Sequence, residues 1–489
     1  MAREVALVGG LFFVVTLAIA CLLGVTDLAL DGDNEHYFFM AERAASGFSP
    51  YHSHFDSKQG LSMLLTGLVI ALGRPLGLGD LAMARVLSLV VLGLSLWLTW
   101  WLTLSLTGSR RAGSFAGLAM IGFSGYLYQA VMGSRPKVFL VLFMLLTMLL
   151  FVQRWHFWAG VSAALAFLCW QPALLMLGVM LLVLLVCSDR LESITRVLAG
   201  ALLTVVAYQL FFFLHGSMGE QLRQTYYFPA KYMRHEFSWA AGPLNKLPQL
   251  WFEGFGRFNL LPLLAGLGLI GSGIGWLRRV KQGGRLAGGP SRGWLYVSLC
   301  FVAWILFTVY DHQGYMDLFV LLPFLAIIVG ATLDRWVTRP GRPIWEQVGV
   351  GVVLLGFGLL IYQGAQMHRT DFGLREQRVL ATRVDRMLEE GEKIYAIECT
   401  HLLAFNKAEN WSKFGFFFRG VGRYLRAEKK GRGVLRLNRQ GERPSVVLVS
   451  HHVPREIRRE LRRSYREVFD REFEQQGIRV FHLSSREDG

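Results

Sequence analysis

Residues 31–61 read DGDNEHYFFMAERAASGFSPYHSHFDSKQGL. The stretch is too polar to enter a bilayer, yet apolar runs flank it at 4–24 and 60–74. A run of about 20 apolar residues is long enough to cross the hydrocarbon core as a helix, so the first run predicts a retained membrane span rather than a signal peptide. The sequence thus places an external segment, residues 25–59, between two membrane spans.

The composition of the whole chain also indicates a membrane protein. Of its 489 residues, 53% are hydrophobic and only 18% are charged, so a soluble fold would lack polar side chains to cover its surface. The net charge of +16 comes from Lys and Arg gathered after residue 368 and in short segments between apolar runs. This distribution is typical of a protein that faces anionic lipid head groups, and no nucleic-acid recognition motif accompanies it.

Further apolar stretches predict a mainly α fold, a polytopic transmembrane bundle of about 11 to 13 spans within residues 1–367. The stretch 157–187 is too long for one crossing and carries Gln171 and Pro172 in its middle, so we expect two short helices there. The other predicted spans lie near 81–107, 113–132, 137–153, 196–215, 258–277, 294–311, 316–333 and 347–366.

Residues 368–489 change to amphipathic and charged sequence, which predicts a small soluble α/β domain outside the membrane. Within it, PREIRRELRRSYREVFDREF (454–473) predicts a basic helix opened by Pro454. This domain either binds an acceptor or an anionic surface, or packs structurally with a solvated basic face. Three buried strands are expected at KIYAIE (393–398), SVVLVS (445–450) and IRVFHL (478–483).

Acidic and aromatic side chains gather at the start of the external segment. Asp33, His36 and Tyr37 would share one face of a short interfacial helix, at i, i+3 and i+4 spacing. A carboxylate there suits the removal of a proton from a hydroxyl that attacks a lipid-linked electrophile, and the Lys58 ammonium suits a phosphate leaving group. The alternative interpretation is a helix cap with solvated charges at Asp31, Asp33 and Glu35.

The run D-N-E-H-Y at 33–37, followed by K-Q-G-L at 58–61, resembles the first loop of the GT-C superfamily of integral-membrane glycosyltransferases. The branch it resembles includes lipid A aminoarabinose transferases, protein O-mannosyltransferase-like enzymes and others that use dolichyl- or undecaprenyl-phosphate sugars. In that branch the loop carries an Asp-Glu pair, a Tyr four residues after the Asp, and Lys-Pro-Pro-Leu. Asp33, Tyr37 and Lys58 stand at matching positions.

The chain departs from this pattern at two places. Asn34 stands where the family has Glu, and Gln59 and Gly60 replace the two prolines. A second carboxylate would then have to come from Asp31 or Glu35.

The resemblance continues further along the chain. In GLGDLAMARVLSLVV, Gly79 and Arg85 resemble the residues that open the third span of these enzymes, and in SRPKVFLVLFML, Arg135 takes a corresponding basic position. Late in the chain, DHQGYMDLFVLLPFL resembles a family segment that contains His or Arg, ends in Tyr and leads into a span with Pro. His312 and Tyr315 stand at the matching positions. Cationic residues at span ends have an alternative role, in which the long side chain reaches back to the interface.

The resemblance implies a glycosyltransferase that moves a monosaccharide from a polyprenyl-phosphate donor to a lipid, glycan or protein acceptor, with inversion. Asp33 would be the general base, supported by Asp31 or Glu35. Lys58, Arg234 and His312 would bind the donor phosphate. The residues implied to bind substrate are His36, Tyr37, Tyr315, Arg85 and Arg135.

Cofactor and location follow from the same resemblance. A divalent cation, Mg or Mn, at Asp31 and Asp33 is left undecided, because some enzymes of the superfamily use one and others do not. The expected location is the plasma (inner) membrane, with the active-site loop and the C-terminal domain on the extracytoplasmic side. The loop 216–257, in which aromatic and basic residues interleave, suits either a sugar phosphate or a membrane interface.

Three alternative functions remain open at this point. A secondary transporter would typically have an internal repeat and charges deep in the spans, but the sequence shows no clear repeat and few such charges. A glycan ligase or polymerase would use a lipid pyrophosphate donor. A non-catalytic assembly component would use its basic C-terminal domain to recruit a partner.

Overall fold

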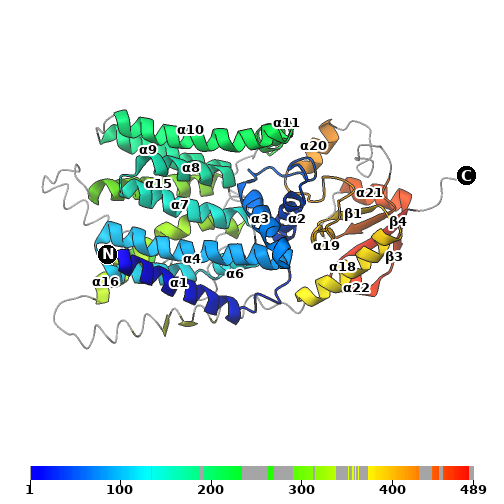
Figure 1. Cartoon of the computed structure of the whole chain (residues 1–489), viewed down its shortest axis with the longest axis horizontal. Helices are drawn as coiled ribbons and strands as arrows, with labels where there is room; N and C mark the ends of the chain where they lie inside the picture. The colour runs from blue at the N-terminus through cyan, green and yellow to red at the C-terminus, as the bar shows by residue number, and fades with distance from the viewer. Residues whose placement is uncertain are drawn as a thin grey trace, which may run out of the picture.

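The structure is a computed structural model, and it has the mainly α architecture that the sequence predicts, followed by a small sheet (Figure 1). It describes residues 2–133, 135–187, 191–233, 261, 263–268, 290–311, 314–337, 351, 355–356, 358–359, 362, 373–428, 443–450 and 455–483.

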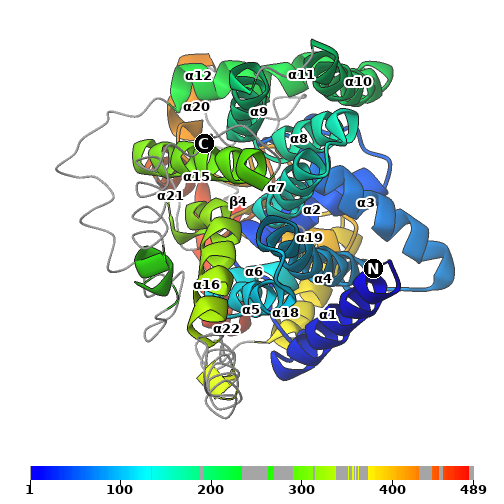
Figure 2. The same ribbon diagram turned by 90° about the vertical axis from the view of Figure 1, so that its left-hand side faces the viewer.

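Long apolar helices run side by side through the first part of the chain, as Figures 1 and 2 show from two directions. The helices of this bundle are α1 (Ala2–Leu22), α3 (Leu61–Gly73), η1 (Arg74–Leu76), α4 (Asp80–Thr107), α5 (Arg110–Ile121), α6 (Ser124–Met132), α7 (Pro136–Val152), α8 (His156–Cys169), η2 (Gln171–Ala173), α9 (Leu174–Val186), α10 (Leu191–Leu214), α11 (Met218–Leu222), η3 (Arg223–Tyr227), α12 (Phe228–Tyr232), α15 (Pro290–Tyr310), η4 (Tyr315–Leu321) and α16 (Leu322–Val337).

Five helices in the described part of the chain are long and apolar enough to cross a membrane. Four shorter apolar helices accompany them. The predicted spans 258–277 and 347–366 lie largely outside the described residues. The five helices are Val5–Leu22, Asp80–Thr107, Leu191–Leu214, Arg292–Tyr310 and Tyr315–Val337.

Two predicted spans are interrupted. The break that Pro172 predicts inside 157–187 is confirmed, because α8 ends at Cys169 and α9 begins at Leu174. The span expected at 113–132 is not straight: the helices Arg110–Ile121 and Ser124–Met132 are together apolar enough to cross a membrane, but they are bent by 71° at Gly122 and Phe123. Glycine weakens a helix interior, and the sequence contains no proline there to signal the bend.

Close helix packing rests on small residues. A Cβ atom at Gly160 would lie 2.0 Å from the carbonyl oxygen of Val197, and one at Gly200 would lie 2.1 Å from that of Phe157. Helices α8 and α10 therefore approach so closely that neither position admits a side chain. On α4 the hydroxyls of Ser88, Ser95, Thr99 and Thr103 donate to the carbonyl four residues earlier, which satisfies these polar groups inside an apolar bundle.

The C-terminal domain is a four-stranded sheet in the order β1-β2-β4-β3, with helices around it. β1 and β2 are parallel, and the other pairs are antiparallel. The three predicted strands are confirmed as β1 (Ile394–Ile397), β2 (Val446–Val449) and β4 (Arg479–Leu483), and the helices are α18 (Leu374–Glu389), α19 (His401–Phe405), α20 (Val421–Glu428), α21 (Arg455–Ser464) and α22 (Arg471–Gln475).

The single basic helix expected at 454–473 is wrong. Helix α21 ends at Ser464, and the next residues form a fourth strand, β3 (Tyr465–Val468), paired with β4. The side chain of Asp470 then accepts from the backbone N–H groups of Glu472 and Phe473, which starts α22 as a new helix. Pairing at the sheet edge overrides the local helical pattern, and Pro454 lies outside the described residues.

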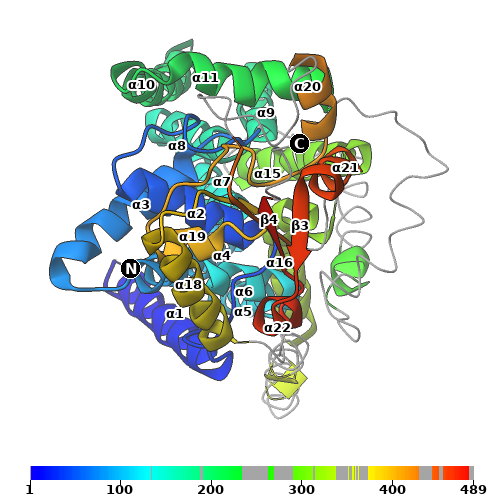
Figure 3. The same ribbon diagram turned by 90° about the vertical axis from the view of Figure 1, so that its right-hand side faces the viewer.

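Helix α2 (Asp33–Ala45) lies between the bundle and the C-terminal domain (Figures 1 and 3). The Phe38 ring lies 5.7 Å from the Phe405 ring, and Arg43 Nη2 donates to the Lys407 carbonyl at 2.6 Å. The expected helix exists, but it does not expose a polar face, because α3 covers one side and α19 covers another. The external segment and the C-terminal domain therefore lie at the same end of the bundle.

Candidate active site

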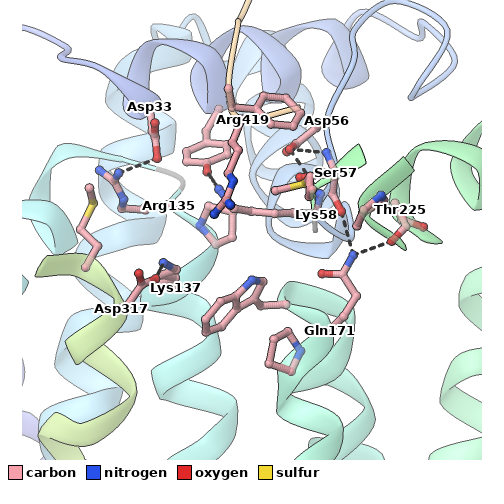
Figure 4. A pocket seen from close by; sticks show the side chains of 18 of the residues that line it. Asp33, Asp56, Ser57, Lys58, Arg135, Lys137, Gln171, Thr225, Asp317 and Arg419 are labelled. Atoms are coloured by element: carbon pink, nitrogen blue, oxygen red, sulfur yellow. Dashed lines mark hydrogen bonds and ion pairs between the residues drawn. The ribbon is translucent and has the colours of Figure 1, made fainter. Parts of the chain in front are cut away.

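A cavity of about 570 Å³ opens where the bundle meets the C-terminal domain (Figure 4). Its walls come from α2, the loop before α3, the start of α7, the break between α8 and α9, the segments around η3 and η4, and residues 416–419 of the C-terminal domain. The cavity is strongly charged. Its charged lining residues are Asp33, Asp56, Lys58, Arg135, Lys137, Asp311, Asp317 and Arg419.

Asp33 is the first residue of α2 and lines this cavity. It follows Gly32, whose φ of 47° is a left-handed conformation that glycine adopts without strain. Arg135 Nη2 lies 2.8 Å from the Asp33 carboxylate. Burial opposes ionisation of Asp33, but the charges of Arg135 and Lys58 outweigh it and lower its pKa from 3.8 to about 2. The carboxylate is thus ionised at neutral pH.

Arg135 is held in place by Gln129, whose side chain makes several hydrogen bonds. The Gln129 side-chain oxygen accepts from Arg135 Nη1 and, at 2.8 Å, from Asn34 Nδ2. The Gln129 amide nitrogen donates to the Tyr315 hydroxyl at 2.9 Å. Through Gln129, Asn34 links the start of α2 to α6, and the same Gln129 oxygen holds Arg135 beside Asp33.

Lys58 and Tyr37 form the second polar pair of the cavity. The Lys58 ammonium donates to the Tyr37 hydroxyl and lies 4.9 Å from the centre of its ring. Burial works against the ammonium, but Tyr37 and the carboxylates of Asp33 and Asp56 raise the pKa of Lys58. Burial also raises the pKa of Tyr37, so the pair is an ammonium and a neutral phenol. Lys58 therefore brings a net positive charge to the cavity.

His36 lies on the same wall, as predicted. Its ring stacks on Phe416 of the C-terminal domain, with centroids 4.9 Å apart and an interplanar angle of 13°. Burial lowers the pKa of His36 to about 3, with a smaller contribution from Lys58, so the imidazole is neutral. The predicted grouping of Asp33, His36 and Tyr37 on one helix face is confirmed.

Other candidates from the sequence do not line this cavity. Asp31 accepts from Asn34 Nδ2 at 3.0 Å, and Glu35 lies 2.6 Å from His401 Nδ1. Arg85 donates to the backbone carbonyls of Val25 and Leu28, so it supports the chain before α2. Tyr315 reaches the site through Gln129.

The remaining two phosphate-binding candidates, Arg234 and His312, lie outside the described residues.

Several lining residues were missed by the sequence analysis. Lys137 pairs with Asp317 and lies 4.6 Å from the centre of the Trp170 ring, at the break between α8 and α9. Gln171 Nε2 donates to the Ser57 carbonyl at 2.7 Å and so fixes the loop before Lys58. In the sequence, Gln171 and Pro172 predict only a helix break, and no local pattern places them beside this loop.

The loop before Lys58 also supplies a missed carboxylate. Asp56 Oδ1 accepts from the backbone N–H groups of Ser57, at 2.7 Å, and Lys58, at 3.3 Å. Burial raises the pKa of Asp56, although Lys58 and these N–H groups oppose the shift. An Asp two residues before the lysine was a readable signal, because such a side chain commonly accepts from the following backbone.

The C-terminal domain covers the cavity with a segment that includes Phe416, Phe418 and Arg419. This segment is held by Glu398, at the end of β1, whose Oε1 accepts from the backbone N–H of Phe417 at 2.7 Å. Nothing in the sequence pattern indicates this contact, because it joins two segments of the C-terminal domain that lie 19 residues apart in the chain.

A divalent cation at Asp31 and Asp33 is not supported by the donor set. Within the described ranges, no group of three or more His, Cys, Asp or Glu side chains could hold a metal ion. The Asp33 carboxylate faces the Arg135 guanidinium, and Asp31 faces the Asn34 amide and the Tyr128 hydroxyl.

Comparisons with known proteins agree with this architecture. Residues 47–210 match the family of DolP-mannose mannosyltransferases. Among solved structures, ArnT from Cupriavidus metallidurans, bound to undecaprenyl phosphate, superposes with a TM-score of 0.63 at 14% identity, over 97% of this chain and 98% of that chain. Its apo form superposes with a TM-score of 0.62 at 16% identity, over 98% of each chain.

A more distant match is the oligosaccharyltransferase of Archaeoglobus fulgidus tethered to an acceptor peptide, with a TM-score of 0.52 and 12% identity. It covers 82% of this chain and 63% of that chain. No curated protein sequence matches the chain. The family match and the shared architecture confirm the resemblance seen in the sequence: the chain is a multi-pass membrane protein with the fold of GT-C glycosyltransferases.

Proposed function

We propose that this protein transfers a monosaccharide from a polyprenyl-phosphate donor to a hydroxyl of a lipid, glycan or protein acceptor, with inversion at the anomeric carbon. One observation carries the proposal: a single cavity at the edge of the bundle contains both an ionised carboxylate, Asp33, and an ammonium without a carboxylate partner among the described residues, Lys58. The reaction needs a base for the acceptor hydroxyl and a cation for the leaving phosphate.

Lys58 is the donor-phosphate ligand in this proposal. Its described polar partner is the neutral Tyr37 hydroxyl, so a phosphate that binds there does not compete with a carboxylate. The phosphate gains negative charge as the sugar leaves, and an ammonium in a partly buried site stabilises that charge more than it stabilises the ground state. The match to ArnT, which was solved with undecaprenyl phosphate, supports this class of donor.

Asp33 is the general base in this proposal. Its carboxylate is ionised, and Arg135 fixes its position through Nη2 while Gln129 fixes Arg135. A carboxylate held by an arginine is a weak base in the resting cavity. It accepts the proton as the hydroxyl oxygen bonds to the anomeric carbon, when that proton becomes strongly acidic. Asp31 and Glu35 do not line the cavity and are not assigned a chemical step.

The location of the reaction follows from the end of the bundle at which the cavity lies. The loop that carries Asp33 and Lys58 and the C-terminal domain share one side of the bundle. We place that side outside the cytoplasm of a plasma (inner) membrane, because the basic residue Arg3 precedes the first span. The acceptor would then approach from the outer surface, between the bundle and the C-terminal domain.

The test uses the full-length protein in liposomes, with radiolabelled polyprenyl-phosphate sugars as donors and a membrane extract as acceptor. Wild type should transfer sugar or slowly hydrolyse the donor, and Asp33→Asn should not, while Asp385→Asn, an exposed position on α18, should behave as wild type. The anomeric configuration of the product, measured by NMR, checks inversion.

Two results would contradict the proposal. Equal turnover by Asp33→Asn, with an unchanged size-exclusion profile, would remove Asp33 from the mechanism. Solute movement across sealed vesicles without any sugar transfer would favour the transporter alternative, and turnover only with a lipid pyrophosphate oligosaccharide would favour the ligase.

A further inference from the structure

Asp56 is a second carboxylate in the cavity, and the proposed reaction has not yet used it. It lies two residues before Lys58, in the loop that enters α3, and only 6% of the residue's surface is exposed. The backbone at Asp56 is also held in position, because its N–H donates to Gln224 Oε1 at 3.1 Å. A buried carboxylate so close to the proposed phosphate ligand must either repel the phosphate or carry a proton.

The two oxygens of Asp56 have different surroundings. Oδ1 accepts from the backbone N–H groups of Ser57 and Lys58 (Figure 4). Oδ2 makes no hydrogen bond or ion pair with any described residue, although Asp56 lines the cavity. The side chain is therefore oriented by one oxygen and leaves the other available to a ligand. This geometry suits a hydrogen bond from a protonated Oδ2 to an anion.

Burial favours the neutral form of Asp56, and the negative charge of Asp33, on α2, adds to this effect. The Lys58 ammonium and the backbone N–H groups of Ser57 and Lys58 oppose the shift. The phenols of Tyr37 and Tyr51 act on it as well, and the neutral Gln224 of η3 accepts from its backbone N–H. Burial raises the pKa of Asp56, whereas that of Asp33 falls to about 2. Carboxylates whose environments push them in opposite directions commonly take opposite roles.

We propose that Asp56 is a further catalytic residue, which donates a hydrogen bond from protonated Oδ2 to the phosphate of the polyprenyl-phosphate donor. This inference rests on the proposed function and deepens it. The phosphate then has two hydrogen-bond donors, the Lys58 ammonium and the Asp56 carboxylic acid. Both come from one loop, two residues apart in the sequence. Binding an anion beside Asp56 further disfavours its ionised form.

The step balances without a further reactant. The acceptor oxygen bonds to the anomeric carbon, and its proton goes to Asp33. The bond between the anomeric carbon and the phosphate oxygen breaks, and its electron pair stays on that oxygen. Asp56 keeps its proton and shares it with the phosphate in a hydrogen bond, which strengthens as the phosphate charge grows from one to two.

The test measures binding of undecaprenyl phosphate to the purified full-length protein in detergent, across pH 6 to 9. Phosphate must bind the protonated form of Asp56, so wild-type affinity should fall by up to about tenfold per pH unit above the pKa of Asp56. Asp56→Asn keeps an oxygen for the Ser57 and Lys58 N–H groups and an amide donor for the phosphate, but it cannot ionise. Its affinity should therefore vary less with pH.

Undecaprenyl phosphate itself also titrates, and this affects wild type and Asp56→Asn equally. The ratio of their affinities at each pH therefore reports on Asp56 alone. Asp385→Asn should keep the wild-type profile. The same pH dependence in Asp56→Asn and wild type would overturn the inference, and so would loss of binding by Asp56→Asn at every pH when its thermal unfolding is unchanged. Absence of binding by wild type at every pH would instead contradict the proposed function.

Discussion

The carboxylate of Glu35, on α2, lies 2.6 Å from Nδ1 of His401, at the start of α19 and 366 residues further along the chain. Both side chains are largely buried, with exposed fractions of 15% and 3%. The contact joins the external segment to the C-terminal domain beside the cavity wall that Phe416 and His36 form. Glu35, expected to support the base, therefore connects the two parts that enclose the site.

Loss of this contact should loosen the C-terminal domain. His401→Ala leaves the Glu35 carboxylate buried without its imidazole partner, which costs about 1–3 kcal/mol of stability. Thermal unfolding in detergent should start at a lower temperature, and proteolysis should release the C-terminal domain sooner. His401→Asn places an amide nitrogen near the position of Nδ1 and should retain most of the stability. Identical unfolding of wild type and His401→Ala would show that the contact carries little energy.

The low pKa of Asp33 predicts how activity depends on pH. A carboxylate whose pKa is lowered to about 2 stays ionised as the pH falls from 8 to 5, so its protonation should not reduce kcat/KM in that interval. Arg135→Gln removes the largest attractive charge, so the pKa of Asp33 should rise and the acid limb of the profile should move to higher pH. An unmoved acid limb would separate Asp33 ionisation from activity.

Replacement of Lys58 should weaken the donor step more than the fold. Lys58→Met removes a charged hydrogen-bond donor from the proposed phosphate site and should lower kcat/KM for the donor by about 10-fold to 100-fold. Tyr37→Phe keeps the ammonium and should have a smaller effect. The control Lys393→Met changes an exposed lysine of the C-terminal domain and should leave kcat/KM unchanged. Equal loss in both lysine variants would argue against a specific role for Lys58.

The raised pKa of Glu398 should make the free energy of unfolding decrease as the pH rises. An ion-paired carboxylate with a lowered pKa would have the opposite effect. Burial raises its pKa from 4.5 to about 7, with smaller contributions from Asp33 and Glu35. The folded state then binds more protons than the unfolded state between these values, so the free energy of unfolding should fall as the pH rises from 4.5 to 7, by on the order of 2–3 kcal/mol.

The matched variant is Glu398→Gln, which keeps an oxygen for the Phe417 N–H but does not titrate. Its thermal unfolding should change less over the same pH interval. The unfolding temperature of each protein is measured at pH 4.5 and pH 7. If it rises over this interval, and by the same amount in wild type and in Glu398→Gln, the pKa of Glu398 is not raised.

Local sequence patterns were enough to predict several parts of the fold. Apolar runs predicted the helical bundle, Pro172 predicted the break before α9, and short apolar segments predicted the buried strands β1, β2 and β4. Helical spacing also placed Asp33, His36 and Tyr37 on one wall of the cavity. Each of these features is set by residues close together in the chain, so the printed sequence contains the information needed to infer it.

The distant groups that complete the site come together only through long-range packing. Arg135 faces Asp33 from 102 residues away, Gln129 joins Asn34 to Tyr315, and Phe416 stacks on His36 across the domain boundary. The same long-range packing directs Glu35 to His401 and leaves Asp56 facing the cavity. Burial and charge act through space and not along the chain. The carboxylate count of the external segment could therefore be read from its sequence, but the role of each carboxylate could not.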